Sequence, residues 1–377
     1  MTNLQKIKLA QIIGSAQFWT VTFVLYMTTQ GLSIEQTYLL LSIFSILVVV
    51  LEYPTGVIGD HFSHRLSITL GYFAFAIVFF LLSFPGSFAY YLTALIFGAL
   101  GTSLISGSDT ALLHSISKDF KKDSSDVRMY SIIVAAISLF LGGYLASIDL
   151  RLPIYCSIIT SFIPGLLILS MKKIPRTDDF DGNIFERSLE GLRHVRDNTI
   201  LFHLMILSSI FGAFFLSFKW FYNPLFMELH IPVSSWGLIV GFATILIALG
   251  TYMYKRSAHT NNFITPIGIF IGLICLVGVT MSPALSLIAL VSSQLLRGYI
   301  GSLFDVELNN AITGTTSRAS ILSLKSLFVR LFSSMYIFGA GFVLGKSSFL
   351  VLMVLTTTLL LTLTVIPILK ITSLKKI

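Results

Sequence analysis

The sequence predicts an all-α integral membrane protein with twelve transmembrane helices in two pseudo-symmetric six-helix bundles around a central cavity. Of the 377 residues, 55% are hydrophobic and 11% are charged, and the mean hydropathy is +0.88. Apolar runs of about 20 residues, long enough to cross a bilayer as helices, follow one another with short polar connections. Because soluble domains carry about a quarter charged residues, this composition excludes a globular soluble protein.

The apolar runs can be placed in order along the chain. A short basic start from Met1 to Lys8 precedes the first run, which has no small-residue cleavage site after it and is expected to stay as a retained helix. The predicted spans cover residues 11–31, 36–58, 65–84, 88–113, 128–148, 152–171, 200–222, 234–254, 262–282, 284–312, 320–344 and 347–369.

Basic residues distinguish the two sides of the membrane. The connections on one side hold basic residues from Lys6 to Lys376, whereas the opposite connections hold Arg151 and Lys346. Because Lys and Arg accumulate in cytoplasmic loops, both termini are predicted to be cytoplasmic. The net charge of +8 therefore reflects membrane orientation, and no nucleic-acid partner is expected.

The longest polar connection divides the chain into two sets of six spans. The predicted N-terminal bundle covers residues 1–171, the cytoplasmic linker 172–199 and the C-terminal bundle 200–377. Within the linker, residues 184–195 place apolar side chains at near-helical spacing among arginines. This piece is either a surface helix at the inner leaflet or a solvated linker helix.

A motif joins the second and third spans. Glu52-x-Pro-Thr-Gly56-x-x-x-Asp60 is followed by Arg65. The part Gly-x-x-x-Asp-x-x-x-x-Arg resembles the loop signature Gly-x-x-x-Asp-Arg-x-Gly-Arg-Lys of the major facilitator superfamily, and the longer string is similar to a bacterial twelve-helix branch. The resemblance implies a secondary transporter of small molecules in the bacterial cytoplasmic (inner) membrane.

The same loop predicts a cytoplasmic gate made of Gly56, Asp60, Arg65 and Arg318. Asp60 is expected to hold the outward-facing state by pairing with a cation or with the amino end of span eleven near Arg318. The corresponding loop of the second half, residues 254–256, reads Tyr-Lys-Arg and contains no acid. The predicted latch is therefore one-sided.

Charged residues inside spans are candidate functional residues, because a charge at mid-bilayer costs several kcal/mol. Span ten carries Arg297 and Asp305 on one polar face with Gln294, Gly301 and Asn309. That face is expected to line a cavity or to couple ions, against the alternative of a structural ion pair between helices. Overlaying the fourth and tenth spans as a duplication matches Asp109 with Asp305.

Span eleven places Arg330 deep in the membrane, where it needs a partner. Asp305 and Glu52 are the nearest acids by depth. Lys325 is shallower and is interpreted as a snorkelling residue. Lys219 lies beside a tryptophan and a tyrosine at the end of span seven, where an aromatic belt with a snorkelling lysine is the favoured interpretation.

The first half contributes polar and aromatic candidates. Trp19 and Tyr26 belong to a stripe on span one, and Gln17 lies beside it. Such a stripe can bind a substrate or serve ordinary helix packing. Glu52 lies deep enough in span two to be costly unless it is paired or protonated, and its structural alternative is an interhelical pin.

These patterns predict a secondary transporter that works by alternating access and is not an enzyme. No ATP-binding loop and no metal-ligand spacing occurs in the sequence, so no cofactor or metal is expected and a proton gradient is the implied energy source. The proton carrier is expected among Asp305, Glu52 and Asp109. The expected partners are a small-molecule substrate, protons and the lipid bilayer, and a monomer is expected.

Three functions compete. The first is proton-coupled export of an amphipathic drug-like compound or secreted metabolite, which follows from the resemblance and from an aromatic-rich interior. The alternative is proton-coupled uptake of an anionic nutrient, which Arg297 and Arg330 could bind. A non-transporting membrane receptor or scaffold ranks below both, because structural packing alone rarely requires several deep charges in both halves.

Overall fold

The computed structural model describes residues 1–61, 63–172, 192–257, 263–280, 282–312 and 318–374. Within these ranges the regular structure is helical and contains no strand. Among the described residues, ten helical stretches are long and apolar enough to cross a membrane, and α13 is a shorter apolar helix. The predicted all-α integral membrane class is thereby confirmed, and twelve spans are compatible with it. Most of the predicted amphipathic linker helix, up to residue 191, lies outside the described ranges.

The chain divides into two compact units. The first unit comprises Met1–Phe180 and His230–Gly241, and the second comprises Asp181–Leu229 and Phe242–Ile377. The first turns of α12 (Val233–Arg256) therefore group with the first unit and the rest with the second. The domain boundaries predicted from the sequence remain predictions.

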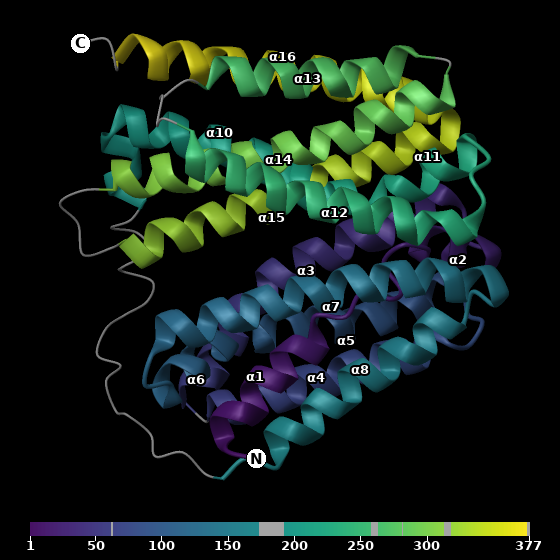
Figure 1. The fold of residues 1–377 in the computed structure, drawn as a ribbon, viewed down its shortest axis with the longest axis vertical. Helices are drawn as coiled ribbons and strands as arrows, with labels where there is room; N and C mark the ends of the chain where they lie inside the picture. Colours follow the sequence, from purple (N-terminus) through teal and green to yellow (C-terminus); the bar gives the residue numbers. More distant parts are fainter. Residues whose placement is uncertain (62, 173–191, 258–262, 281, 313–317, 375–377) are drawn as a thin grey trace. The chain divides into compact units, whose positions relative to one another are not determined.

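The first unit is built around α4, which packs against α5 and α8, while α1 packs against α7 and α8 (Figure 1). Where α4 crosses α5, a side-chain carbon at Gly71 would lie 3.0 Å from the carbonyl oxygen of Gly101. Small residues let membrane helices approach this closely. The helices are α1 (Asn3–Gly14), α2 (Phe23–Thr29), α3 (Ile34–His61), α4 (His64–Leu82), α5 (Phe88–Ile105), α6 (Ser108–Ile116), α7 (Phe120–Ile148) and α8 (Leu152–Leu169).

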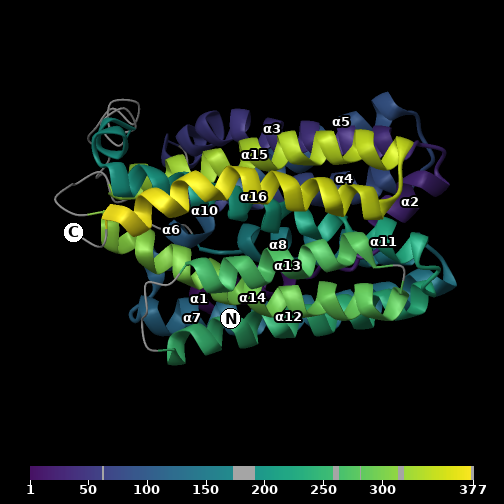
Figure 2. The same cartoon turned by 90° about the horizontal axis from the view of Figure 1, so that it is seen from above.

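The second unit is built around α10, which packs against α14, α15 and α16, while α13 packs against α14 and α16 (Figure 2). Its core is rich in phenylalanine: the ring of Phe214 lies 5.7 Å from that of Phe270, edge to face. Besides α12, the elements are α10 (Thr199–Ser217), the 3-10 turn η1 (Phe218–Trp220), α11 (Tyr222–Glu228), α13 (Ile264–Val279), α14 (Pro283–Ala311), α15 (Arg318–Lys346) and α16 (Phe349–Leu374).

Candidate functional site

The predicted first span is not one continuous helix. Helix α1 ends at Gly14 and α2 begins at Phe23. Residues 15–22 between them are not α-helical and are called the first break. The expectation of a single helix over 11–31 is therefore wrong. Side-chain bonds to α7 replace part of the missing ladder: the Ser15 hydroxyl donates to the Ser131 carbonyl at 3.0 Å, and the Gln17 backbone N–H donates to the Ser138 hydroxyl at 2.7 Å.

The first break lies against the backbone of α7. A side-chain carbon at Gly142 would lie 2.2 Å from the carbonyl oxygen of Phe18, closer than any real contact of that kind. Only glycine lets the broken segment approach α7 this closely. Packing therefore fixes the path of the first break.

The predicted aromatic stripe of the first span is divided by the break. Trp19 stacks edge to face on Phe23 at 5.0 Å and lies 5.5 Å from the ring of Phe79. Tyr26 is buried on α2, and its hydroxyl donates to the carbonyl of Leu82. The Gln17 side chain is exposed. In this structure Trp19 and Tyr26 have packing partners within the first unit, and whether the stripe also binds a substrate remains a prediction.

Two predicted carboxylates flank another interruption, between α5 and α6. Ser106 ends α5, and Gly107 follows with a positive φ of 78°, a conformation that glycine adopts without strain. The Ser106 hydroxyl donates to Glu52 Oε1 at 3.2 Å. Asp109 lies in the first turn of α6, where Oδ1 accepts from the Thr110 backbone N–H at 2.6 Å. The α5/α6 break thus brings Glu52 and Asp109 to one region of the first unit.

The second unit interrupts its first span as well. Helix α10 ends at Ser217, η1 occupies Phe218–Trp220, and α11 begins at Tyr222, so residues 218–221 form the second break. Pro224 explains its position. Proline has no N–H to donate to the carbonyl four residues earlier, which belongs to Trp220, and its ring crowds that carbonyl.

Three cations gather at the second break and are called the cation cluster: Lys219, Arg297 and Arg330. The Lys219 ammonium lies 4.5 Å from the centre of the Trp220 ring, and the Arg297 guanidinium lies 5.5 Å from that of Phe215. The positive charges of Arg297 and Arg330 both act on the Lys219 ammonium. Such like charges repel one another, the more so in a medium of low dielectric constant.

Neutral groups surround the cation cluster. Arg297 donates to Gln294 Oε1 at 3.3 Å, and Gln294 is itself fully buried. Arg330 Nε is buried without a hydrogen-bond partner among the described residues. One turn along α15, the Ser333 hydroxyl bonds the Ser217 hydroxyl of α10 at 2.8 Å. Buried nitrogens of this kind are normally hydrogen-bonded.

Asp305 is not the partner of Arg330. Its carboxylate accepts from the Lys325 ammonium at 2.7 Å, joining α14 to α15. The sequence suggested that Lys325 snorkels as a free cation. In the structure it forms an ion pair instead. The Asp305 side chain is 69% exposed and that of Lys325 is 18% exposed, so the pair is half-covered by the second unit. Sequence spacing placed Asp305 on the polar face of its span, but it could not show which helix packs beside that face.

The predicted gate is described only in part. Gly56 and Asp60 lie in the last turns of α3, and Arg318 begins α15, but the surroundings of their side chains lie outside what the structure describes. The Arg65 guanidinium on α4 donates to the carbonyl of Leu169 at the end of α8, at 2.7 Å. The latch between Asp60 and Arg318 remains a prediction.

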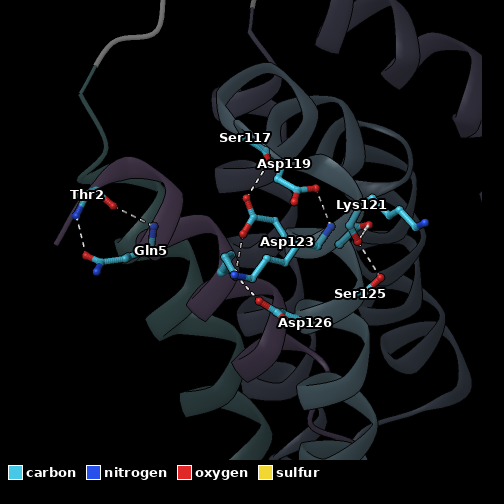
Figure 3. A network of polar contacts seen from close by, with 11 residues as sticks. Thr2, Gln5, Ser117, Asp119, Lys121, Asp123, Ser125 and Asp126 are labelled. Carbon is cyan, nitrogen blue, oxygen red and sulfur yellow. Dashed lines mark hydrogen bonds and ion pairs between the residues drawn. The ribbon is translucent and has the colours of Figure 1, made fainter.

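Polar side chains also tie the start of α1 to α7 (Figure 3). The Lys8 ammonium donates to Asp123 at 2.9 Å and to Asp126 at 3.1 Å, and Ser117 donates to Asp123 at 2.5 Å. A pocket of about 700 Å³ adjoins these residues. The hydrogen bond to Asp123 raises the pKa of Lys8 above its ordinary value of 10.5. The network was not predicted, because nothing in the sequence pairs residues this far apart.

A family model described as Major Facilitator Superfamily matches residues 9–373. The chain belongs to this superfamily. As a member, it is a multi-pass membrane transporter and not an enzyme, as predicted. The match to the family model extends over both compact units and includes the helix breaks described above.

Known relatives agree with this assignment. An uncharacterized MFS-type transporter, YxaM of Bacillus subtilis (strain 168), is 20% identical to this facilitator over 254 residues. The match covers 64% of this chain and 63% of that protein, which is less than two thirds of its length.

Solved transporter structures share the fold. The nucleoside transporter NupG has a TM-score of 0.79 at 15% identity, covering 98% of this chain and 99% of that one. A bacterial homologue of the iron transporter ferroportin has a TM-score of 0.74 at 14% identity, covering 98% of each chain. A D-xylose-proton symporter has a TM-score of 0.69 at 13% identity, covering 95% and 96%. At these identities the likeness shows the fold alone.

Sequence reasoning missed two features of this facilitator. Lys219 was assigned to an aromatic belt, and the structure indeed stacks it on Trp220, but it also lies within the electrostatic reach of Arg297 and Arg330. The first break was missed because residues 15–22 contain no charge, glycine or proline that would signal an interruption. A signal for the second break did exist, since Pro224 stands inside an otherwise helical pattern.

Proposed function

We propose that the chain is a secondary active transporter that moves a small molecule across the bacterial cytoplasmic membrane by alternating access, as a monomer with both termini in the cytoplasm. The observation that supports it best is the interruption of the first membrane span in each unit, at residues 15–22 and 218–221. Discontinuous membrane helices free backbone and polar groups where substrates and coupling ions bind. Family membership supports the same class of function.

Protons are the proposed coupling ion, and Glu52 and Asp109 are their proposed carriers. Both carboxylates lie at the α5/α6 break within one apolar unit. A carboxylate in such surroundings gains or loses a proton when its hydration or partners change, which is what coupling requires. Asp305 is less suited to this role because it is largely exposed and paired with Lys325.

Two directions of transport are proposed in competition. Export of an amphipathic compound in exchange for protons follows from the family resemblance. Proton-coupled uptake of an anionic nutrient is favoured by Arg297 and Arg330, whose charges have no acidic partner among the described residues of the second unit. The two modes move protons in opposite senses relative to the substrate, so one measurement separates them.

The test uses purified full-length protein in liposomes loaded with a pH-sensitive dye and challenged with panels of metabolites and antibiotics. A compound that enters together with protons acidifies the lumen, whereas a compound that enters in exchange for protons makes it more alkaline. Acidification supports uptake and alkalinisation supports export. The absence of any protein-dependent flux across the panels would overturn the transport proposal.

Substitutions then test the proton carriers. Glu52→Gln and Asp109→Asn are each expected to reduce proton-coupled flux by about tenfold or more, because a side-chain amide does not bind and release a proton near neutral pH. Asp197→Asn is the matched control, since that side chain is 68% exposed and pairs with its sequence neighbour Arg196. Unchanged coupling in both test variants, with normal expression, would exclude Glu52 and Asp109 as the carriers.

A further inference from the structure

The cation cluster of the second unit points to the chemical class of the cargo. We propose that Lys219, Arg297 and Arg330 together bind an organic anion that carries at least two negative charges. This inference rests on the proposed transport function and names its substrate class. It also adds Lys219, which the sequence did not select, to the two arginines.

The three cations come from different elements that meet at the end of α10. Arg297 reaches α10 from α14, because its guanidinium lies 5.5 Å from the ring of Phe215. Arg330 belongs to α15, which is joined to α10 one turn away by the hydroxyl contact between Ser217 and Ser333, 2.8 Å long. Phe215 and Lys219 are four residues apart, so Arg297 approaches α10 on the side that carries Lys219. The positive charge of Arg330 acts on the same ammonium group.

The charges of this cluster are not compensated within the unit. Among the described residues, Asp305 pairs with Lys325, Glu228 accepts from the backbone N–H of Phe349 at 2.7 Å, and no carboxylate lies within ion-pair distance of the cluster. A charge held in apolar surroundings without a partner is costly, and three that repel one another are more so. An anion bound to the cluster would offset these charges.

The number of positive charges in the cluster also limits the charge that the anion can carry. A single carboxylate would leave two of the three positive charges uncompensated, whereas a dicarboxylate or a phosphate monoester offsets two. Guanidinium groups bind either kind of oxyanion with paired hydrogen bonds, and the lysine adds a movable point charge. One turn along α14 from Arg297, the side-chain position of Gly301 is open, with no atom of another helix within 4 Å among the described residues.

The test measures the thermal unfolding midpoint of the purified full chain in detergent. The probes are phthalate and phenyl phosphate at about 10 mM. Neutral benzamide at the same concentration and sodium chloride at matched ionic strength serve as controls. Both dianions are expected to raise the midpoint by about 2 °C or more, because a ligand that binds the folded state stabilises it. A larger shift with one of them distinguishes a dicarboxylate from a phosphate ester.

Three substitutions connect the shift to the cluster. Lys219→Gln, Arg297→Gln and Arg330→Gln are each expected to lose most of the stabilisation by the dianions. Lys346→Gln is the matched control, because Lys346 lies on the same helix as Arg330 and stacks on the Phe342 ring at 4.0 Å without belonging to the cluster. Its dianion shift should equal that of the unmodified protein.

The unfolding midpoint of the protein without ligand is a second readout, which distinguishes a binding role of Arg330 from a structural one. Removing one repelling charge should raise the unfolding midpoint of Arg330→Gln by about 2 °C, whereas breaking a structural ion pair would lower it. Arg330→Lys keeps the charge and should retain part of the dianion shift. The proposal is overturned if the dianions stabilise no more than the controls do, or if the glutamine variants keep the full shift.

These outcomes are separate from those of the flux experiment. Proton-coupled flux of a neutral or cationic compound, together with no dianion binding, would refute the anion site and leave the transporter standing. Dianion binding that depends on the cluster, without flux of any compound, would refute transport and leave the binding site standing.

Discussion

Both units interrupt their first membrane span, but they use the interruption for different chemistry. The first break, residues 15–22, is held by neutral contacts to α7 and by the close approach of Phe18 to Gly142. The second break, residues 218–221, is adjoined by the three charges of the cation cluster. The first spans of the two units thus share an interrupted backbone and differ in the side chains around the interruption.

The acids follow the opposite distribution. In the first unit, Glu52 and Asp109 lie at the α5/α6 break, whereas in the second unit the matching candidate, Asp305, is an exposed partner of Lys325. If the proposals above hold, the first unit handles protons and the second handles the anionic cargo. A helix break at a similar place in each unit therefore does not fix the chemistry of the side chains around it.

The largest structural effect is expected at Gly142. In Gly142→Ala the added carbon would lie 2.2 Å from the Phe18 carbonyl oxygen, and a backbone atom cannot move aside as a flexible side chain can. We expect a loss of stability of about 1–3 kcal/mol, measured as the unfolding midpoint in detergent. This tests whether packing fixes the path of the first break.

Gly98→Ala is the control for that substitution. Its added carbon would lie 3.4 Å from the Phe44 ring, an ordinary contact, so a small or favourable change is expected. Equal stability of the two variants would show that the first break can relax and that α7 does not define it.

A smaller effect is expected from the pair of Asp305 and Lys325. Asp305→Asn should lower stability by less than about 1 kcal/mol, since one partner is largely exposed. It also frees the Lys325 ammonium, so dianion binding in the second unit should stay the same or become tighter. Loss of proton-coupled flux in this variant would place an essential acid in the second unit and contradict the assignment of proton binding to the first unit.

The smallest effect is expected at the Lys8 network of the first unit. Because the hydrogen bond to Asp123 raises the pKa of Lys8 above 10.5, its stabilisation is complete below that pH and is lost as the pH rises through the higher folded-state value. Lys8→Met should therefore lower the unfolding midpoint slightly at pH 8, and the difference should shrink in strongly alkaline buffer. A difference that is independent of pH would indicate lost packing and not lost charge.

The sequence was sufficient for the class of fold. Hydropathy and loop charges predicted the membrane class and the family motif, because the bilayer demands long apolar helices wherever the chain crosses it. The first break escaped this reasoning, since its bonds go to Ser131 and Ser138 on a helix far along the chain. Hydropathy reports the apolar character of a segment and not the partner of its backbone.

The candidate site was predicted in part for a similar reason. Spacing placed Arg297 and Asp305 on one helical face, and burial cost singled out Arg330. The choice between partners depends on which helices are adjacent: α14 and α15 bring Lys325 to Asp305 and leave Arg330 without an acid. Lys219 was assigned to an aromatic belt, because an aromatic neighbour is equally typical of a membrane interface and of a binding site.

The stacking of Lys219 on Trp220 has a spectroscopic consequence. The emission of an indole ring depends on the electric field across it, and here a cation lies 4.5 Å from the ring centre. The other tryptophans, Trp19 and Trp236, both belong to the first unit. Replacing those two with phenylalanine would leave Trp220 as a native optical reporter of the second unit, without an attached label.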